Sequence, residues 1–147
     1  MKYFKMSRHF NKNIPEEYGL VKEENKIISP IDHSIWEPKK LYDFGWGKEN
    51  GYYKIPLPNF EGLIKIILEE NDEDDIYGAA AIILESYPKE LLLFLKSLAT
   101  PSQCIKEKLN MIFHLQTPIN RSFQKQMSLK EIFEEQKEWV DISKKFQ

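Results

Sequence analysis

Apolar side chains recur three and four residues apart through most of this chain beyond residue 58, which is the spacing of amphipathic helices. Leu63, Ile64 and Ile67 form one such row, and Ile105, Leu109 and Ile112 form another. The spacing predicts helices over residues 60–70, 73–87, 88–98, 101–113 and from 129 onward.

Residue types that favour helix starts precede these segments. Asn59, Asp72, Thr100 and Ser128 are suitable N-caps, because their side-chain oxygens can accept from unpaired backbone N–H groups. Pro88 suits a first helical position, where its missing N–H has no consequence. In the last helix one face is expected to collect Leu129, Ile132, Phe133, Gln136 and Val140.

Residues 1–58 have a different texture, with four of the six glycines and five of the eight prolines. The apolar runs 18–21 and 26–29 predict a short β-hairpin. The segment 36–53 combines aromatic and charged side chains without a regular period, so it is expected to form loops and short strands held by aromatic rings.

The joins between the first three predicted helices are short, so neighbouring helices should pack antiparallel. The run Gly78–Ala81 offers a small-residue face that another helix could approach closely. The expected fold is therefore mainly α: an antiparallel helical stack of the HEAT/armadillo type over residues 59–147. An irregular lobe over 1–58, with a short hairpin, would complete a single domain spanning 1–147.

Charge is distributed unevenly, although the net charge is only −2. Residues 59–100 carry three basic and nine acidic side chains, whereas the segments on either side each carry an excess of two basic ones. A negative block repels nucleic acid and attracts a basic partner. A single cysteine and the absence of any apolar stretch of about 20 residues favour a cytoplasmic protein that binds no membrane.

Known catalytic and metal-binding patterns are missing from the sequence. His9, His33, His114 and Cys104 are scattered, with no zinc-binding spacing. An EF-hand loop starting at Asp72 would need oxygen ligands and a glycine where apolar and aromatic residues stand. We therefore expect no metal, no cofactor, no catalytic residues and no enzymatic activity.

The densest charge lies in Glu69, Glu70, Asp72, Glu73, Asp74 and Asp75. Capping of the helix from residue 73 explains the last four of these acids, because carboxylates are favourable at a helix N-terminus. It does not explain Glu69 and Glu70, which stand where a helix ends. Two interpretations stay open: a solvated loop, or a surface for a basic partner. Trp46 and Tyr42 are candidate aromatic anchors for the same partner.

The stretch DEDDIYGAAAIILESYPKELLLFLKSL (72–98) resembles the helical, HEAT-like immunity proteins of bacterial polymorphic and contact-dependent toxin systems. The resemblance implies a protein that binds a cognate toxin, often a basic nuclease, and blocks its active site. It would act as a monomer or weak dimer. One alternative is a helical-repeat adaptor that binds a peptide or a second copy of itself. Another is a small enzyme of unrecognised type.

Overall fold

The computed structural model describes residues 2–6, 15–43, 47–113, 115 and 128–146, and the side chains of 40–43 and 47–50 are outside this description. The chain divides into two compact units, Met1–Ile82 and Ile83–Gln147, with the division inside one helix. The single-domain organisation expected for 1–147 stays a prediction.

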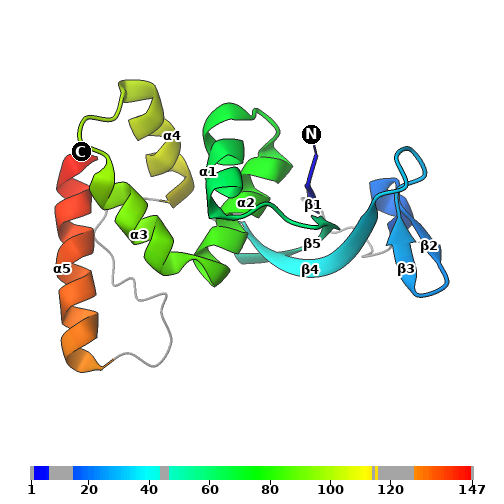
Figure 1. The fold of residues 1–147 in the computed structure, drawn as a ribbon, viewed down its shortest axis with the longest axis horizontal. Helices are drawn as coiled ribbons and strands as arrows, with labels where there is room; N and C mark the ends of the chain where they lie inside the picture. Colours follow the sequence, from blue (N-terminus) through cyan, green and yellow to red (C-terminus); the bar gives the residue numbers. More distant parts are fainter. Residues whose placement is uncertain (1, 7–14, 44–46, 114, 116–127, 147) are drawn as a thin grey trace. The chain divides into compact units, whose positions relative to one another are not determined.

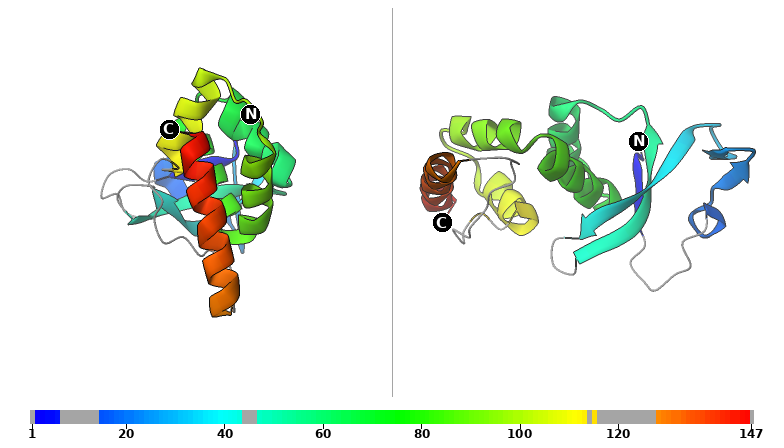
Figure 2. Two further views of the ribbon diagram at one scale, coloured as in Figure 1. Left: turned by 90° about the vertical axis from the view of Figure 1, so that its left-hand side faces the viewer. Right: turned by 90° about the horizontal axis from the view of Figure 1, so that it is seen from below.

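The first unit contains an antiparallel sheet of five strands in the order β1-β5-β4-β3-β2 (Figure 1). Its strands and a short 3-10 helix have the following bounds: β1 Phe4–Met6, η1 Pro15–Tyr18, β2 Val21–Glu23, β3 Lys26–Ile28, β4 Ile35–Asp43 and β5 Gly47–Ile55. Strands β4 and β5 are the longest and run side by side along their whole length (Figure 2). The predicted hairpin is present as β2 and β3, but it is only one corner of a larger sheet.

The sequence-based expectation of a mainly α-helical HEAT/armadillo stack with an irregular N-terminal lobe is therefore wrong. The fold is mixed, with five α-helices and a substantial antiparallel sheet. Strand β4 contains a proline, Pro38, which lies beyond the part of β4 that pairs with β3. A proline is tolerated there because one edge of the strand carries no ladder.

A small, largely aromatic hydrophobic core lies on one face of this sheet. Leu20, Trp36 and Tyr52 are buried together, and the Tyr18 ring meets Tyr52 edge-on with 5.1 Å between ring centroids. The Trp36 indole N–H donates to the Ser34 hydroxyl over 2.8 Å. These aromatic residues therefore stabilise a regular sheet, not the loops that the sequence suggested.

Helices α1 (Phe60–Glu69) and α2 (Glu73–Ser86) follow the sheet along the chain. Asn59 caps α1 as predicted, accepting from the Gly62 N–H over 3.0 Å. In the small-residue run of α2, Gly78 packs against a strand. The fully buried Phe4 of β1 lies so close to Gly78 that a Cβ atom there would be 2.7 Å from the Phe4 Cβ and closer still to its ring.

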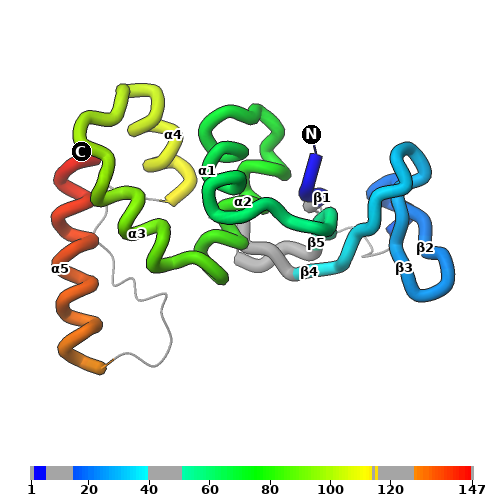
Figure 3. The backbone as a smooth tube through the Cα atoms, in the orientation of Figure 1, coloured from blue at the N-terminus to red at the C-terminus, as the bar shows by residue number. Residues whose placement is uncertain are grey.

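The second unit contains α3 (Pro88–Ser97), α4 (Gln103–Phe113) and α5 (Leu129–Lys145), whose backbone can be followed in Figure 3. Pro88 begins α3 and Ser128 caps α5, both as predicted. The cap of α4 is Ser102 and not Thr100, because the Ser102 hydroxyl accepts from the Ile105 N–H. The buried described residues of this unit are Ile83, Leu91, Leu92, Leu95, Leu109, Ile112, Phe113, Leu115, Glu135, Trp139, Ile142, Ser143 and Phe146.

The prediction for the packed face of α5 is wrong. Leu129 and Phe133 are 74% and 71% exposed, whereas Trp139, Ile142 and Phe146 are buried. The helix carries two apolar rows at helical spacing, and periodicity alone does not indicate which of them is covered.

Candidate functional site

The acidic residues Glu69–Asp75, here called the acidic turn, join α1 to α2 in the first unit. Glu69 ends α1, and the backbone N–H of Glu70 closes that helix by donating to the Ile66 carbonyl. Asp72 precedes α2, and Glu73, Asp74 and Asp75 form its first turn. The turn thus places carboxylates at one helix C-terminus and one helix N-terminus.

Asp72 performs two structural roles. One of its carboxylate oxygens caps α2 by accepting from the backbone N–H groups of Asp74 and Asp75, over 2.9 and 3.3 Å. Its other oxygen accepts from the Lys2 ammonium over 2.6 Å. Burial acts to raise the pKa of Asp72, but the Lys2 contact and the backbone donors outweigh it and hold the pKa below its ordinary value. Lys2 also lies 3.5 Å from Asp74, so one ammonium serves two acids.

Asp75 is buried and connects α2 to the sheet. Its Oδ1 accepts from the backbone N–H groups of Tyr3 and Phe4, over 2.8 and 2.9 Å. Burial raises the pKa of this carboxyl, and the two N–H donors offset only part of that effect. The residue therefore does more than the helix capping that its position suggested, because it also fixes the start of β1.

The structure thus assigns Asp72, Asp74 and Asp75 to internal contacts. The remaining acids are Glu69, whose side chain is 63% exposed, the exposed Glu73 and the partly exposed Glu70. Lys65 lies 4.0 Å from Glu69 in an i, i+4 pair. Such exposed ion pairs contribute little to stability, so a cation of a partner can replace Lys65 beside Glu69. The outward part of the acidic turn is therefore Glu69, Glu70 and Glu73.

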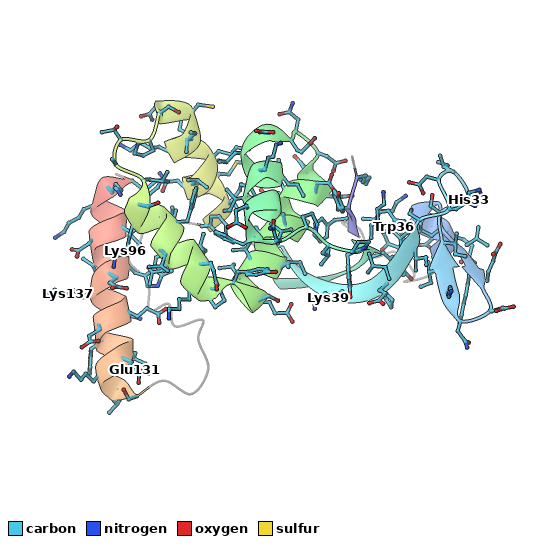
Figure 4. All side chains as sticks on the ribbon, in the orientation of Figure 1. His33, Trp36, Lys39, Lys96, Glu131 and Lys137 are labelled. Carbon is cyan, nitrogen blue, oxygen red and sulfur yellow. The ribbon has the colours of Figure 1, made fainter. Side chains whose placement is uncertain are left out.

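The aromatic anchors expected from the sequence are not placed with this turn. Trp46 and the Tyr42 side chain lie outside the described residues. Trp36, labelled in Figure 4, and Tyr52 come from the same aromatic segment. Both are buried in the sheet, so their rings are not available to a partner.

Within the described part of the chain, no group of three or more His, Cys, Asp or Glu residues is placed to hold a metal ion. Cys104 is exposed and forms no disulfide. His33 is exposed in a turn with a φ of 60°. What the acidic turn offers chemically is a set of hydrogen-bond acceptors for a cationic group.

The sequence reasoning missed a second charged surface, between α3 and α5. Two adjoining cavities of about 470 and about 240 Å³ are lined there by lysines of α3 and carboxylates of α5. The available signal was the i, i+3, i+4, i+7 spacing of Glu131, Glu134, Glu135 and Glu138. This row is less conspicuous in the sequence than Glu69–Asp75, because apolar and basic residues separate its acids.

Comparison of the chain with protein-family models, with curated proteins and with solved structures finds no match. None of the helices that the structure describes has both the length and the apolar character that a bilayer crossing requires. The function is therefore inferred from the residues and the geometry of the acidic turn.

Proposed function

We propose that this chain is a non-catalytic binding protein that recognises a basic protein through the outward part of the acidic turn. The observation that carries the proposal is the local excess of negative charge. Six acids stand in seven positions, within residues 59–100, a segment that carries three basic and nine acidic side chains. Lys2 contacts Asp72 and Asp74, and Lys65 lies 4.0 Å from Glu69. The turn therefore belongs to a negatively charged segment, whose field attracts a basic partner.

Local stability alone does not account for Glu69 and Glu70. At the C-terminal end of α1 the helix dipole disfavours negative charge, by about 0.3–1 kcal/mol for each exposed group. The nearby acids add repulsion. A cost of this kind is expected where carboxylates serve recognition, because surface charges accelerate and orient the encounter with a partner of opposite sign.

In the form of the proposal that follows the resemblance to immunity proteins, the partner is a basic, nuclease-like toxin. The carboxylates of the acidic turn would occupy the positions that phosphates of a nucleic acid occupy on such an enzyme. The protein would act in the cytoplasm as a monomer or weak dimer, and its exposed, unpaired Cys104 suits a reducing compartment.

The test is affinity selection from a display library of the source organism's genome, followed by binding measurements on each selected protein. The variant Glu69→Lys/Glu70→Lys is compared with Glu17→Lys/Glu23→Lys, which makes the same charge change at exposed sites of the first unit. We expect basic partners whose affinity falls about tenfold or more in the first variant and changes little in the second. Equal affinities in the two variants would refute the proposal.

A second candidate function is an adaptor that uses the outer face of α5. Leu129, Phe133 and Val140 lie four and seven residues apart, and their exposures are 74, 71 and 37%. Large exposed apolar side chains in one row are typical of helix-mediated interfaces. This candidate predicts that Leu129→Ser/Phe133→Ser abolishes partner binding or self-association in sedimentation, while Glu69→Lys/Glu70→Lys leaves it unchanged.

A further inference from the structure

The smaller of the two cavities between α3 and α5 is lined by both charged and apolar side chains. It is lined by Leu92 and Leu93, by Lys89 and Lys96, and by Glu131, Glu134, Glu135 and Glu138. Figure 4 shows Lys96 on α3 facing α5 and Glu131 in the first turns of α5. Lys96 is already paired with Glu138 at 3.0 Å. The cavity, here called the α3–α5 groove, therefore has more carboxylates than cations.

Glu135 is the decisive residue of this groove. This residue is buried, with only 6% of its surface exposed. The Oε1 atom accepts from the Trp139 indole N–H over 3.3 Å, whereas the buried Oε2 has no hydrogen-bond partner in the described structure. A buried carboxylate oxygen without a donor is unfavourable. A rotation of the Glu135 side chain toward the groove that it lines would let an incoming donor reach this oxygen and remove that penalty.

Repulsion among the carboxylates of α5 lowers the stability of this helix. Glu131 and Glu135 stand four residues apart, as do Glu134 and Glu138, and like charges at this spacing destabilise a helix. Lys96 offsets the charge of Glu138, and Ser128 donates to Glu131 over 3.0 Å. Among the described residues, Glu134 receives neither such a hydrogen bond nor such an ion pair.

The volume of about 240 Å³ is below the range of cavities that hold drug-sized ligands or cofactors, but it admits a single long side chain. Leu92 and Leu93 offer an apolar wall for methylene groups, and the carboxylates lie around it. A guanidinium is more weakly hydrated than an ammonium and can donate to two carboxylates at once. The groove therefore matches arginine better than lysine.

We propose that the α3–α5 groove is a binding site for an arginine side chain of a peptide segment, with Glu135 and Glu134 as its acceptors. This site lies in the second unit and does not depend on the acidic turn. It adds a specific recognition element for a basic partner to the general charge attraction of that turn.

The test uses the full-length protein and a capped tripeptide, Ala-Arg-Ala, followed by NMR on the Trp139 indole N–H. We expect a saturable shift of this resonance, weaker binding of the lysine analogue and no shift with the citrulline analogue, which keeps the shape but lacks the charge. No saturable shift, or equal shifts with arginine and citrulline, would overturn the proposal. Shifts that depend on protein concentration without peptide would assign the groove to a second copy and also overturn it.

Variants make the test specific. Glu135→Gln should weaken arginine binding about tenfold, a change of about 1.4 kcal/mol, and Glu134→Gln should weaken it to a smaller extent. If Glu135→Gln does not fold, the exposed Glu134 still decides the question. Glu61→Gln, an exposed acid of α1, is the matched control and should bind as the wild type does. Glu69→Lys/Glu70→Lys should also keep arginine binding, so failure of the groove and failure of the acidic turn are distinguishable.

Discussion

Gly78 should resist replacement by alanine, although it lies inside a helix. In an exposed helix interior, Gly→Ala is expected to stabilise by about 0.5–1 kcal/mol. Here the new Cβ would lie 2.7 Å from the Phe4 Cβ and nearer to two ring carbons, far inside the 3.5–4.0 Å of ordinary carbon contacts. Phe4 is fully buried and its strand is paired with β5, so the ring has little room to retreat.

Overpacking of this kind costs about 1–3 kcal/mol, which exceeds the gain in helix propensity. We expect Gly78→Ala to lower the free energy of unfolding by about 1–2 kcal/mol net in urea denaturation. In a Phe4→Ala background the two closest contacts are absent, so the same substitution should cost at least about 1 kcal/mol less. Ser86→Ala, at an exposed position of the same helix, is the control and should change stability by less than about 0.5 kcal/mol.

A stabilisation by Gly78→Ala would refute the close packing of β1 on α2. An identical cost in both backgrounds would show that the effect does not arise from Phe4.

Three further predictions concern polar contacts. Asp75→Ala leaves two strand N–H groups without an acceptor and should cost about 2–4 kcal/mol in urea denaturation. Asp75→Asn keeps the accepting Oδ1 atom. Because burial raises the pKa of Asp75, the wild type loses stability as the pH rises above 3.8, whereas the Asn variant does not. The stability of the variant relative to the wild type should therefore increase with pH in this range. Lys2→Met should lower the free energy of unfolding by only about 0–1 kcal/mol, because the side chains of Lys2 and Asp72 are both 39% exposed. Since the Lys2 contact lowers the pKa of Asp72, this loss should be present above pH 3.8 and should vanish as the pH falls through the lowered pKa. Lys145→Met removes donors to the last carbonyls of α3 and should lower the free energy of unfolding by about 1–2 kcal/mol in thermal denaturation. Lys145→Arg keeps the charge and the donors and should restore the stability, whereas an unchanged stability of Lys145→Met would contradict the role of these contacts.

The features that the sequence predicted well are local ones. The caps Asn59, Asp72 and Ser128 and the first-turn Pro88 depend on residues within one helical turn, and all four are confirmed. Such signals require no knowledge of the rest of the fold.

Strands β2 to β5 are consecutive neighbours in the sheet, but the segment 36–53, which supplies most of β4 and β5, has no regular alternation that would indicate strands. The placement of β1, in contrast, depends on long-range contacts. The contacts of Asp75 with β1 join residues 71 and 72 positions apart, and no local pattern indicates them. The packed face of α5 was missed for another reason, since two apolar rows compete for burial and the choice depends on the neighbouring helices. The sequence shows the cluster of acids, whose role as a recognition site stays a prediction, but the internal roles of Asp72 and Asp75 could not be separated from a recognition role without the fold.

The central claim is that this protein binds a basic partner through the outward carboxylates of the acidic turn, Glu69, Glu70 and Glu73. The most direct measurement is the affinity of the selected partner for wild type and for Glu69→Lys/Glu70→Lys, at about 50 mM and about 500 mM salt. The account predicts an affinity that falls with salt in the wild type, and a loss of about tenfold or more in the variant at low salt. An affinity that neither salt nor this charge reversal changes would contradict it.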